Sequence, residues 1–443
     1  MSKKVALHNL GCKVNAYEVE AMQQLLEKAG YEIVPFEEGA DIYLINTCTV
    51  TNIADRKSRQ MLHKAKKMNP NAIVVATGCY VQTDTQKLEE DSAVDLILGN
   101  NQKKQIVEAL EEYEKEHTKK VKVIEINKTK EYEELSIGYT AEHVRAYIKV
   151  QDGCNQFCTY CIIPYARGRV RSRKIAEVLD EVRALAARGY KEVVLTGIHL
   201  SSYGVDFKEE ERESLLSLIQ AVHEVEGIQR IRLGSLEPRI ITEEFMEGIS
   251  SLPKVCPHFH LSLQSGCDKT LRNMNRRYSA AEYAEKCELI RKFYPAPALT
   301  TDVIVGFPME TEEDFEESYE FVKNIHFYET HIFKYSRRQG TKAAAMEGQL
   351  TEAVKSIRSE KMIALHEIRA KEYETSMIGK TLELLLEEEV EINGKTYFMA
   401  HSKEYVRAVI EKTKDRKVND LVRAKAVDFA DEHVLLAICE ELY

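Results

Sequence analysis

The chain has 443 residues, of which 44% are hydrophobic and 30% are charged, enough for two or three domains with substantial cores. No apolar run approaches the roughly 20 residues that span a bilayer, and the first residues contain too short an apolar stretch for a secretory signal peptide. Composition therefore excludes a helical membrane protein, and we expect a cytoplasmic protein without a membrane partner. Ten cysteines in a reducing compartment favour metal or redox chemistry over a disulfide framework.

The first 100 residues alternate between strand and helix patterns. Short apolar runs predict strands, and amphipathic segments between them predict helices. The expected strands are 5–10, 41–46 and 72–77, and the expected helices are 17–28, 52–68 and about 83–90. This order is typical of an open α/β domain with a parallel sheet.

Three cysteines each follow one of these predicted strands. Cys12 comes just beyond the first strand, Cys48 beyond the second and Cys79 beyond the third. The carboxyl ends of parallel strands share one edge of the sheet, where helix N-termini favour negative charge. The pattern therefore predicts an iron–sulfur cluster with three protein ligands. The other cysteines show no such pattern and are interpreted as packing residues: Cys256, Cys267, Cys287 and Cys439.

A second set of three cysteines lies within eight residues, at Cys154, Cys158 and Cys161. A 4Fe-4S cluster takes four ligands, so a Cys-x3-Cys-x2-Cys loop leaves one iron open to a substrate or cofactor. This spacing is the signature of the radical S-adenosylmethionine (SAM) enzymes, which the region resembles. The alternative is a zinc site whose fourth ligand, such as His143 or His199, is brought in by the fold.

From about residue 140 the strand–helix alternation continues with a longer period. Six strands are expected, at 144–151, 192–197, 230–235, 258–264, 299–306 and 329–336, with helices clearest at 174–189, 279–293 and 312–325. Six βα units predict an incomplete (βα)6 barrel with its active site at the carboxyl ends of the strands. The cysteine loop lies at that end, as do Gly197, Glu237, Gln264 and Gly306. Glycines there allow the backbone to approach a nucleoside closely.

The segment after about residue 375 changes to short strands. Strands are expected at 380–386, 405–410, 422–429 and 435–438, and Asn393-Gly394 is a type I′ hairpin signal. Four or five short strands in 65 residues indicate a small β-barrel, a shape often used to bind oligonucleotides. We therefore expect three domains, covering residues 1–133, 134–375 and 376–443.

A net charge of −10 does not by itself indicate a nucleic-acid-binding protein, so such a role depends on local basic clusters. A charge run is often only a solvated face. Three clusters are candidates for binding phosphates: Arg56, Lys57, Arg59, Lys64, Lys66 and Lys67; Arg167, Arg169, Arg171, Arg173 and Lys174; and Arg272, Arg276 and Arg277.

Taken together, the chain resembles the methylthiotransferase family of radical SAM enzymes along its whole length. That family has an N-terminal cluster domain, a radical SAM barrel and a C-terminal TRAM β-barrel. The motif at 11–15, Gly-Cys-Lys-Val-Asn, and the segments 46–55 and 161–173 resemble the branch that modifies threonylcarbamoyladenosine in tRNA. The isopentenyladenosine branch tends to carry Gly-Cys-Gln-Met-Asn, and the ribosomal-protein branch Gly-Cys-Pro-Lys-Asn.

The resemblance implies two 4Fe-4S clusters and SAM as cofactors. Cys154, Cys158 and Cys161 would hold the cluster that binds and reductively cleaves SAM, and the resulting radical would remove hydrogen from C2 of the adenine. Cys12, Cys48 and Cys79 would hold the cluster that presents sulfur, and a second SAM would supply the methyl group. Five residues are expected to contact the cofactor: Tyr160, Gly197, Glu237, Gln264 and Gly306.

The implied partners are the anticodon loop of a tRNA, an electron donor such as flavodoxin or ferredoxin, and a source of sulfur. Bases in loops can be splayed out and read, which suits a deep site with basic rims. Two alternatives remain open. One is the same chemistry on isopentenyladenosine or on a ribosomal-protein aspartate, and the other is a non-catalytic iron–sulfur carrier or RNA-binding scaffold.

Overall fold

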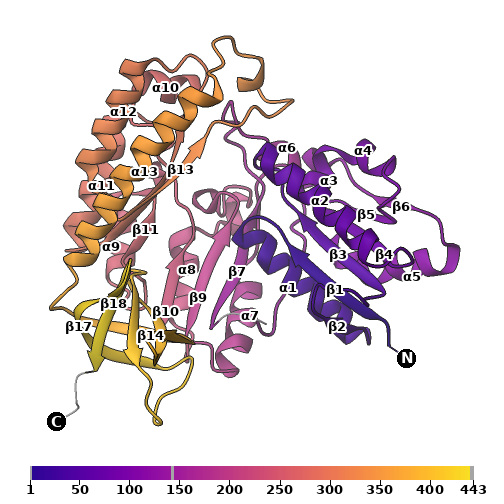
Figure 1. Cartoon of the computed structure of the whole chain (residues 1–443), viewed down its shortest axis with the longest axis horizontal. Helices are drawn as coiled ribbons and strands as arrows, with labels where there is room; N and C mark the ends of the chain where they lie inside the picture. The colour runs from indigo at the N-terminus through magenta and orange to yellow at the C-terminus, as the bar shows by residue number, and fades with distance from the viewer. Residues whose placement is uncertain (1, 141–143, 440–443) are drawn as a thin grey trace.

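The structure is a computed structural model that describes residues 2–140 and 144–439. It has three parts, which are an N-terminal α/β sheet, a central partial barrel with outer helices and a C-terminal β-barrel (Figure 1). Within the described ranges, no helix combines the length and apolar character that crossing a membrane requires.

The N-terminal sheet has six strands in the order β2-β1-β3-β4-β5-β6, and every neighbouring pair is parallel. The three predicted strands are confirmed, and three strands of three residues each were missed. The strands are β1 (Lys4–Asn9), β2 (Glu32–Val34), β3 (Ile42–Thr47), β4 (Ile73–Gly78), β5 (Leu96–Leu98) and β6 (Lys120–Lys122); the helices are α1 (Lys13–Lys28), α2 (Asn52–Met68), α3 (Cys79–Thr83), α4 (Thr85–Glu89) and α5 (Ile106–Glu116).

Every residue of the central strand β3 is buried, which shows that both faces of this sheet are covered. Tyr43 and Ile45 belong to a core on one face, whereas Ile42 and Leu44 belong to a second core on the other. A parallel strand covered on both sides is expected to be apolar throughout rather than alternating. The covered faces leave the carboxyl edge of the sheet as the place where a site can form.

The central part is the expected partial (βα)6 barrel. Its parallel strands follow each other as β7, β9, β10, β11, β12 and β13. A bridge between Leu236 and Leu261 joins the sheet that ends at β10 to the sheet that begins at β11. A short strand, β8 (Arg171–Ser172), adds antiparallel to β7. The six strands are β7 (Arg145–Asp152), β9 (Glu192–Gly197), β10 (Arg230–Leu233), β11 (His258–His260), β12 (Ala298–Val305) and β13 (Glu329–Lys334).

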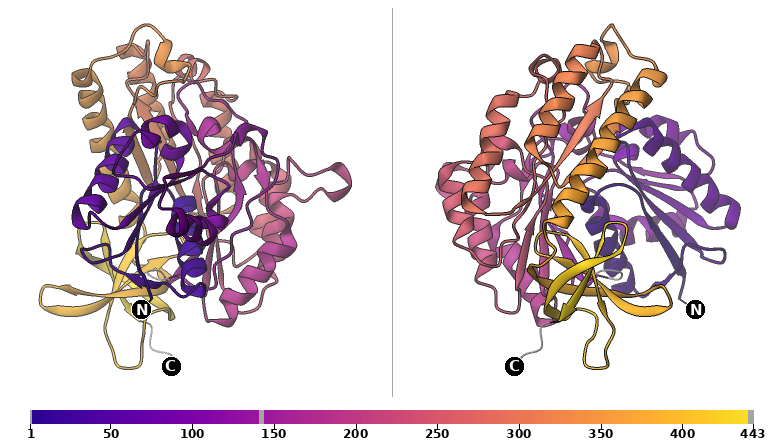
Figure 2. Two further views of the ribbon diagram at one scale, coloured as in Figure 1. Left: turned by 90° about the vertical axis from the view of Figure 1, so that its right-hand side faces the viewer. Right: turned by 60° about the vertical axis from the view of Figure 1, so that its left-hand side comes forward.

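The barrel helices lie outside the strands, as the right-hand view of Figure 2 shows. Val303 and Val305 of β12, for example, pack into the core that these helices share with the strands. The opposite, inner face of the strands is therefore left for a site. The helices of this part are α6 (Ile163–Arg167), α7 (Ile175–Ala187), α8 (Leu215–His223), α9 (Glu243–Ser250), α10 (Asp268–Asn273), α11 (Ala280–Phe293), α12 (Glu312–Ile325) and α13 (Glu352–Thr375).

The C-terminal strands close into a small barrel in the order β14-β15-β16-β18-β17. The turn between β14 and β15 has Asn393 and Gly394 with φ values of 52° and 76°, as the predicted type I′ hairpin requires. Its strands are β14 (Thr381–Ile392), β15 (Lys395–Ser402), β16 (Arg407–Glu411), β17 (Leu421–Asp431) and β18 (Val434–Cys439). The small β-barrel expected from the sequence is thereby confirmed.

This small barrel docks against the amino ends of the central strands. Arg145 pairs with Glu387, and Arg230 pairs with Glu383. The ring of Tyr405 lies 4.9 Å from the guanidinium of Arg145. The C-terminal part thus occupies the end of the central barrel opposite the cysteine loop, which leaves the carboxyl ends of the strands facing the N-terminal sheet.

Candidate active site between two sets of cysteines

The first three cysteines meet at the carboxyl edge of the N-terminal sheet. Cys12 precedes α1, Cys48 follows β3 directly, and Cys79 follows β4 directly. These strands are neighbours in the sheet, and the Cβ of a side chain at Gly11 would lie 3.2 Å from the Cys48 Sγ. Burial raises the pKa of the Cys48 thiol to about 12, and Cys79 and Cys12 add to the increase. The three sulfurs therefore share one electrostatic environment.

A buried arginine from the barrel reaches this first set. Arg167, at the end of α6, is fully buried and donates from Nε to the Cys79 Sγ at 3.2 Å. Its Nη2 donates to the Oε2 of Glu18 at 2.9 Å and to the Oδ1 of Asn15 at 2.5 Å. A guanidinium in this position offsets the negative charge that thiolates and a bound cluster bring to a buried site.

The second set lies in the loop that leaves β7. Gly153 has a φ of 72°, and a Cβ there would collide with the carbonyl oxygen of Arg169, so only glycine fits before Cys154. The backbone of Thr159 is fixed on both sides, because its N–H donates to Met274 O and its carbonyl accepts from the Ala343 N–H. The loop is therefore held by segments that follow other barrel strands.

A second arginine serves this set in the same way. Arg276 donates from Nη1 to the Cys158 Sγ at 3.3 Å and from Nε to the Tyr278 hydroxyl at 2.9 Å. Burial raises the pKa of Cys161 to about 12 and that of Cys154 to about 11, and Arg276 opposes both increases. Metal binding removes the proton from a coordinating thiol, so a metal bound by either set would be held by thiolates despite these raised pKa values.

The spacing within each set does not favour a single zinc ion. Tetrahedral Zn–S bonds of about 2.3 Å place ligand sulfurs about 3.8 Å apart. Among the residues that the structure describes, neither cysteine set has all three sulfurs within 4.8 Å of one another. His199 does not join Cys154, Cys158 and Cys161 within that distance; its Nδ1 lies 2.7 Å from Ser202 Oγ. The other suggested zinc ligand, His143, lies outside the described residues.

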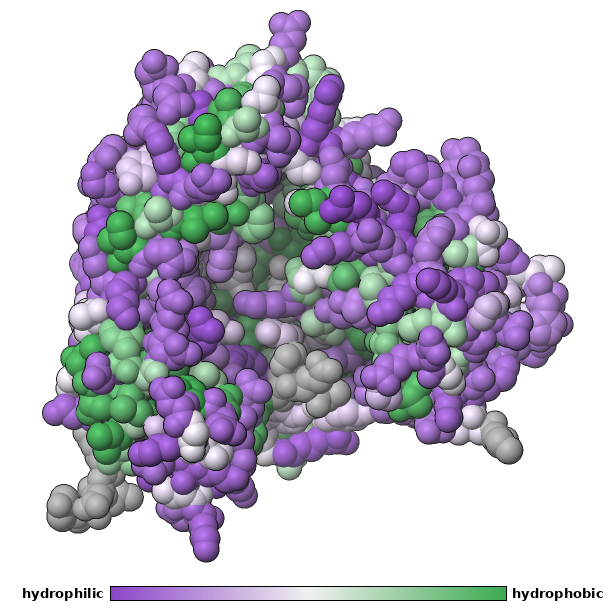
Figure 3. Space-filling model, viewed as in Figure 1, coloured by the Kyte–Doolittle hydropathy of each residue, from purple (hydrophilic) through white to green (hydrophobic). Residues whose placement is uncertain are grey.

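A pocket lies between the two sets. It is lined by Val50 and Thr51, which follow Cys48, and by Tyr160 and Cys161 of the barrel loop. Strand residues from β12 and β13 form its floor, including Asp302, Ile304 and Phe333. Figure 3 shows the surface hollowed between the barrel and the N-terminal part, with apolar residues visible inside. A ligand in this pocket would touch segments adjoining both sets of cysteines.

The five residues expected to contact a cofactor do not all reach this pocket. Tyr160 and Gln264 line it together with Cys161. Glu237 is buried, binds the Nε of Arg239 at 2.8 Å, and acts electrostatically on Cys154. A Cβ added at Gly197 would lie 2.8 Å from Gln151 Oε1, and one added at Gly306 would collide with the side chain of Lys355. Tyr160 and Gln264 are thus the two that share a surface with a cysteine ligand candidate.

The structure corrects the interpretation of most of the second basic cluster and of Arg276 in the third. Arg167, Arg171 and Arg173 are buried, so they are not available to phosphates, and only Arg169 in that run is exposed. Arg276 donates to Cys158, whereas Arg272 and Arg277 are exposed. In the first cluster Lys66 pairs with Asp95, whereas the other members are exposed on α2: Arg56, Lys57, Arg59, Lys64 and Lys67. That helix therefore presents an exposed basic face.

Several site residues were missed by sequence reasoning. Glu18 lies within α1 and is fully buried, where it pairs with Arg167, Lys149 and Lys103. Asn100, beyond the end of β5, donates to Cys79 Sγ at 3.8 Å and to Ala166 O at 2.7 Å. The one signal for Glu18 was an acidic residue on the apolar face of a helix, and Asn100 had none.

Comparisons with known proteins agree with this arrangement. Residues 4–99 match the model of the uncharacterized protein family UPF0004, and residues 148–322 match the radical SAM superfamily. The chain is 42% identical to the threonylcarbamoyladenosine tRNA methylthiotransferase MtaB of Bacillus subtilis over 95% of this chain and 93% of that protein. It is 44% identical to the protein of that name from Aquifex aeolicus, over 89% and 95% of the two chains.

A relative of another branch is less similar than these two proteins, and the solved structures share the fold at low identity. A tRNA-2-methylthio-N(6)-dimethylallyladenosine synthase of Thermoanaerobacter pseudethanolicus is 37% identical over 86% of this chain and 81% of that protein. The methyltransferase TsrM from Kitasatospora setae, solved with cobalamin and a 4Fe-4S cluster, has a TM-score of 0.56 at 16% identity, covering 77% of each chain. The chain therefore belongs to the radical SAM methylthiotransferase family, in its threonylcarbamoyladenosine tRNA methylthiotransferase branch.

Proposed function

We propose that this protein adds a methylthio group to C2 of N6-threonylcarbamoyladenosine next to the anticodon of tRNA. The observation that carries the proposal is the pocket between the two cysteine sets, which adjoins Val50 on one side and Cys161 on the other. Each set has three sulfurs, so each leaves one metal position without a protein ligand. A base in the pocket would adjoin the segment that follows Cys48 and the loop that carries Cys161.

The family match implies a 4Fe-4S cluster and SAM, and Cys154, Cys158 and Cys161 fit the cluster. When bound, the cluster supplies one electron that cleaves SAM and yields a radical able to remove the C2 hydrogen. The chain's own contribution is positional. Thr159 anchors the loop through its backbone, and Arg276 balances charge at Cys158. Tyr160 and Gln264 would then shape the side of the pocket nearest SAM.

We assign a second 4Fe-4S cluster to Cys12, Cys48 and Cys79, which would present sulfur at its open position. The surroundings fit an anionic cluster, because Arg167 and Asn100 both donate hydrogen bonds to the Sγ of Cys79. Anaerobic reconstitution should give about eight irons per chain for two such clusters. A Cys79→Ala variant should lose about half of the iron, whereas Cys287→Ala, inside a core helix, should keep it.

The pocket walls suit an adenine base in a site that excludes water. Ile304, Phe333 and Val50 supply apolar surface, and Tyr160 supplies an aromatic ring. Holding the base, SAM and sulfur in contact is what the protein adds to radical chemistry, since the cofactors carry the difficult bond changes. Water in such a pocket would permit side reactions of the radical.

Basic side chains around the pocket mouth suit an RNA backbone. Helix α2 begins at the mouth, where the Asn52 N–H donates to Ser336 Oγ at 3.1 Å. Its exposed face carries Arg56, Lys57 and Lys64. Arg337, on the barrel side of the same contact, is also exposed. Phosphate contacts of this kind position a nucleic acid without reading its sequence.

The remaining parts of the proposal follow from the chemistry. Reductive cleavage of SAM requires an electron donor such as flavodoxin or ferredoxin, and repeated turnover requires a sulfur source; both belong with tRNA in the cytoplasm. We also propose 1–133, 134–375 and 376–443 as the domains. The last of these would be a TRAM domain that assists tRNA binding, and its strands begin at Thr381, after α13 ends at Thr375.

Nucleoside profiling of tRNA tests the function directly. Cells that lack this protein should accumulate N6-threonylcarbamoyladenosine and lose its 2-methylthio derivative, as measured by mass spectrometry. The gene for the wild-type protein should restore the modified nucleoside, and the gene for Cys158→Ala should not. Loss of 2-methylthio-isopentenyladenosine instead would assign the chain to the other tRNA substrate. An unchanged tRNA profile would favour the ribosomal-protein target or a carrier role.

A further inference from the structure

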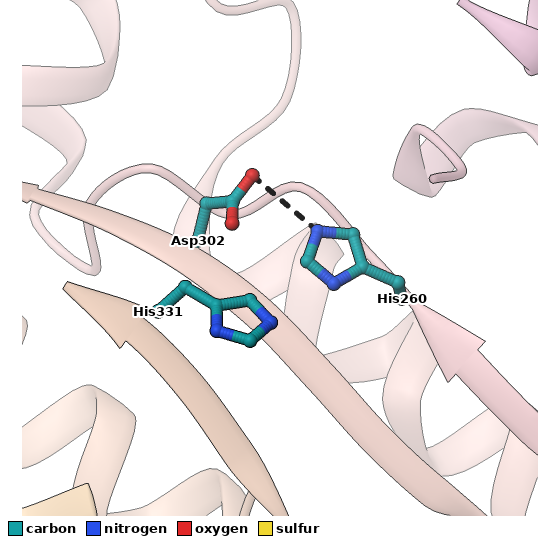
Figure 4. Close-up of side chains that lie close together, drawn as sticks. All are labelled: His260, Asp302 and His331. Carbon is teal, nitrogen blue, oxygen red and sulfur yellow. Dashed lines mark ion pairs between the residues drawn. The ribbon is translucent and has the colours of Figure 1, made fainter. Parts of the chain in front are cut away.

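Three polar side chains converge on the inner face of the barrel below the pocket. His260, Asp302 and His331 come from the neighbouring strands β11, β12 and β13, and one polar atom from each lies within 4.8 Å of the others (Figure 4). Asp302 and His331 are direct partners in the strand register. The Nε2 of His260 lies 3.4 Å from the Oδ2 of Asp302. We call these three residues the His–Asp–His group.

The strand alternation fixes which way this group faces. Val303, next to Asp302, packs into the core shared with the outer helices, and so does the neighbouring Val305. Successive side chains of a strand point to opposite faces, so Asp302 points into the barrel. Thr300, on the same face, accepts or donates a hydrogen bond at 2.9 Å to the Nδ1 of His260 and thereby orients its ring.

The group is continuous with the pocket between the cysteine sets. Asp302 itself lines that pocket, together with Ile304 on the same strand and Phe333, two residues beyond His331. Cys161 and Tyr160 line the pocket as well. A ligand that places its base against the cysteine loop can therefore extend a polar substituent toward Asp302 and the two imidazoles.

Hydrogen-bonding capacity at the group is not used up within the protein. Among the described residues, His331 makes a stacking contact with His260 at 5.7 Å but no hydrogen bond or ion pair, and its side chain is exposed. The structure gives the carboxylate of Asp302 one partner in those ranges, His260. Polar groups that a ligand covers need partners from that ligand, because their burial is otherwise costly.

We propose that the His–Asp–His group reads the threonyl part of the substrate, an inference that rests on the proposed function. The threonylcarbamoyl substituent ends in a carboxylate and a hydroxyl. A ring N–H group of His331 would donate to the carboxylate, and Asp302, whose other oxygen is held by His260, would accept from the hydroxyl. An isopentenyl substituent offers neither group and would leave His331 and one oxygen of Asp302 without a partner, so the same contacts reject it.

The test compares two substrates in two variants. The substrates are one tRNA carrying N6-threonylcarbamoyladenosine and the same tRNA with the threonyl carboxylate converted to its methyl ester. Kd and kcat/KM are measured for the reconstituted wild-type protein, for His331→Leu and for Asp302→Asn. The matched control is His366→Gln, because His366 lies on α13 and accepts the backbone N–H of Thr330, whose side chain points away from the inner face.

The wild-type protein should prefer the acid over the ester by about 10- to 100-fold in kcat/KM, as expected for loss of a charged hydrogen-bond partner. His331→Leu should abolish most of that preference by losing affinity for the acid alone, and His366→Gln should keep it. Iron content equal to wild type verifies that the variants are folded. Because the tRNA backbone binds elsewhere, the Kd for tRNA should depend on salt concentration equally in the wild-type protein and in every variant.

Three results would overturn the inference in distinguishable ways. If His331→Leu and Asp302→Asn both kept the wild-type preference for the acid over the ester, the His–Asp–His group would not read the threonyl part. The proposed function would be unaffected. Stoichiometric zinc or iron that is lost from each variant would assign the group to a metal. Wild-type protein that methylthiolates only isopentenyladenosine tRNA would reject the proposed function and the inference together.

Discussion

The Nε of Arg167 lies 3.2 Å from the Sγ of Cys79, although the two residues belong to different parts of the chain. Arg167 sits six residues after Cys161, at the end of the short helix α6 that follows the second cysteine set. Its guanidinium also binds Glu18 of α1. A single buried side chain thus links the loop of one cysteine set to a sulfur of the other.

Replacing Arg167 should therefore damage the first set without touching the ligands of the second. In Arg167→Met, the carboxylate of Glu18 loses one of its partners in a buried site, which should destabilise the protein by about 3 kcal/mol. Reconstituted iron should fall toward the content of one cluster. The control is Arg169→Met, since Arg169 is exposed and its guanidinium lies over the ring of Phe157 at 4.5 Å, away from the sulfurs. Equal iron and equal Tm in both variants would contradict this role.

The glycine before Cys154 offers a second test, on the backbone. Gly153 has a φ of 72° and its Cα faces the carbonyl of Arg169 at a distance that admits no Cβ. Gly153→Ala should displace the loop and reduce binding of iron by the second set, with SAM cleavage lost in proportion. Gly189→Ala is the matched control, because Gly189 has a φ of 91° but nothing within 4 Å of an added Cβ. The control should lose some stability yet retain the cluster.

Local patterns in the sequence were sufficient for much of the fold. The six barrel strands and the long helices were predicted because each extends over several turns or a full apolar run, and the cysteines were placed by their position after a strand. The strands β2, β5 and β6 were missed because three residues carry too little periodicity, whereas β11, equally short, lies within the longer predicted run 258–264. Their apolar residues are buried by partners distant in sequence.

The site was predictable at its cysteines and not at the groups around them. Arg167, Arg171 and Arg276 were interpreted as phosphate-binding residues because sequence shows charge but not burial. Glu18, which pairs with Arg167, lies 149 residues away in the chain, and Cys158, which accepts from Arg276, lies 118 residues away. The pocket is likewise formed by Val50 and Phe333, which only the packing of two separate sheets brings together.

Glu192 lies among the arginines that dock the C-terminal barrel, and its ionisation should make the free energy of unfolding depend on pH in the acid range. Burial opposes ionisation of Glu192, but Arg232, Arg145 and Arg230 outweigh it and lower its pKa from 4.5 to about 2. A lowered pKa stabilises the folded state fully above pH 4.5, and this contribution is lost as the pH falls through 2. It amounts to about 3 kcal/mol at roughly 1.4 kcal/mol per pKa unit.

Urea unfolding at several pH values measures this contribution. Glu192→Gln should be less stable than wild type by a similar amount at pH 7, and the gap should narrow as the pH approaches 2. Glu226→Gln replaces an exposed carboxylate in the same part of the chain and should follow the wild type. A gap that stays constant with pH would show that Glu192 acts through packing alone.

The exposed face of α2 should carry part of the tRNA affinity. Reversal of Arg56, Lys57 and Lys64 to Glu should weaken tRNA binding and lower the slope of log K against log salt by about two to three, since each lost phosphate contact contributes about 0.7 to 0.9. Reversal of three exposed basic residues elsewhere, Lys115, Arg183 and Lys208, serves as the control. A slope that is unchanged by the α2 reversals would place the tRNA on another surface.

Turnover by purified protein tests the central claim most directly. Protein reconstituted with iron and sulfide under anaerobic conditions is given a reductant, SAM and a tRNA that carries N6-threonylcarbamoyladenosine, and the digested nucleosides are analysed by mass spectrometry. Wild-type protein should form the 2-methylthio nucleoside with consumption of SAM, and Cys79→Ala and Cys158→Ala should each form none. Full product from Cys79→Ala, or none from wild-type protein that cleaves SAM, would contradict a reaction between two cysteine-held clusters.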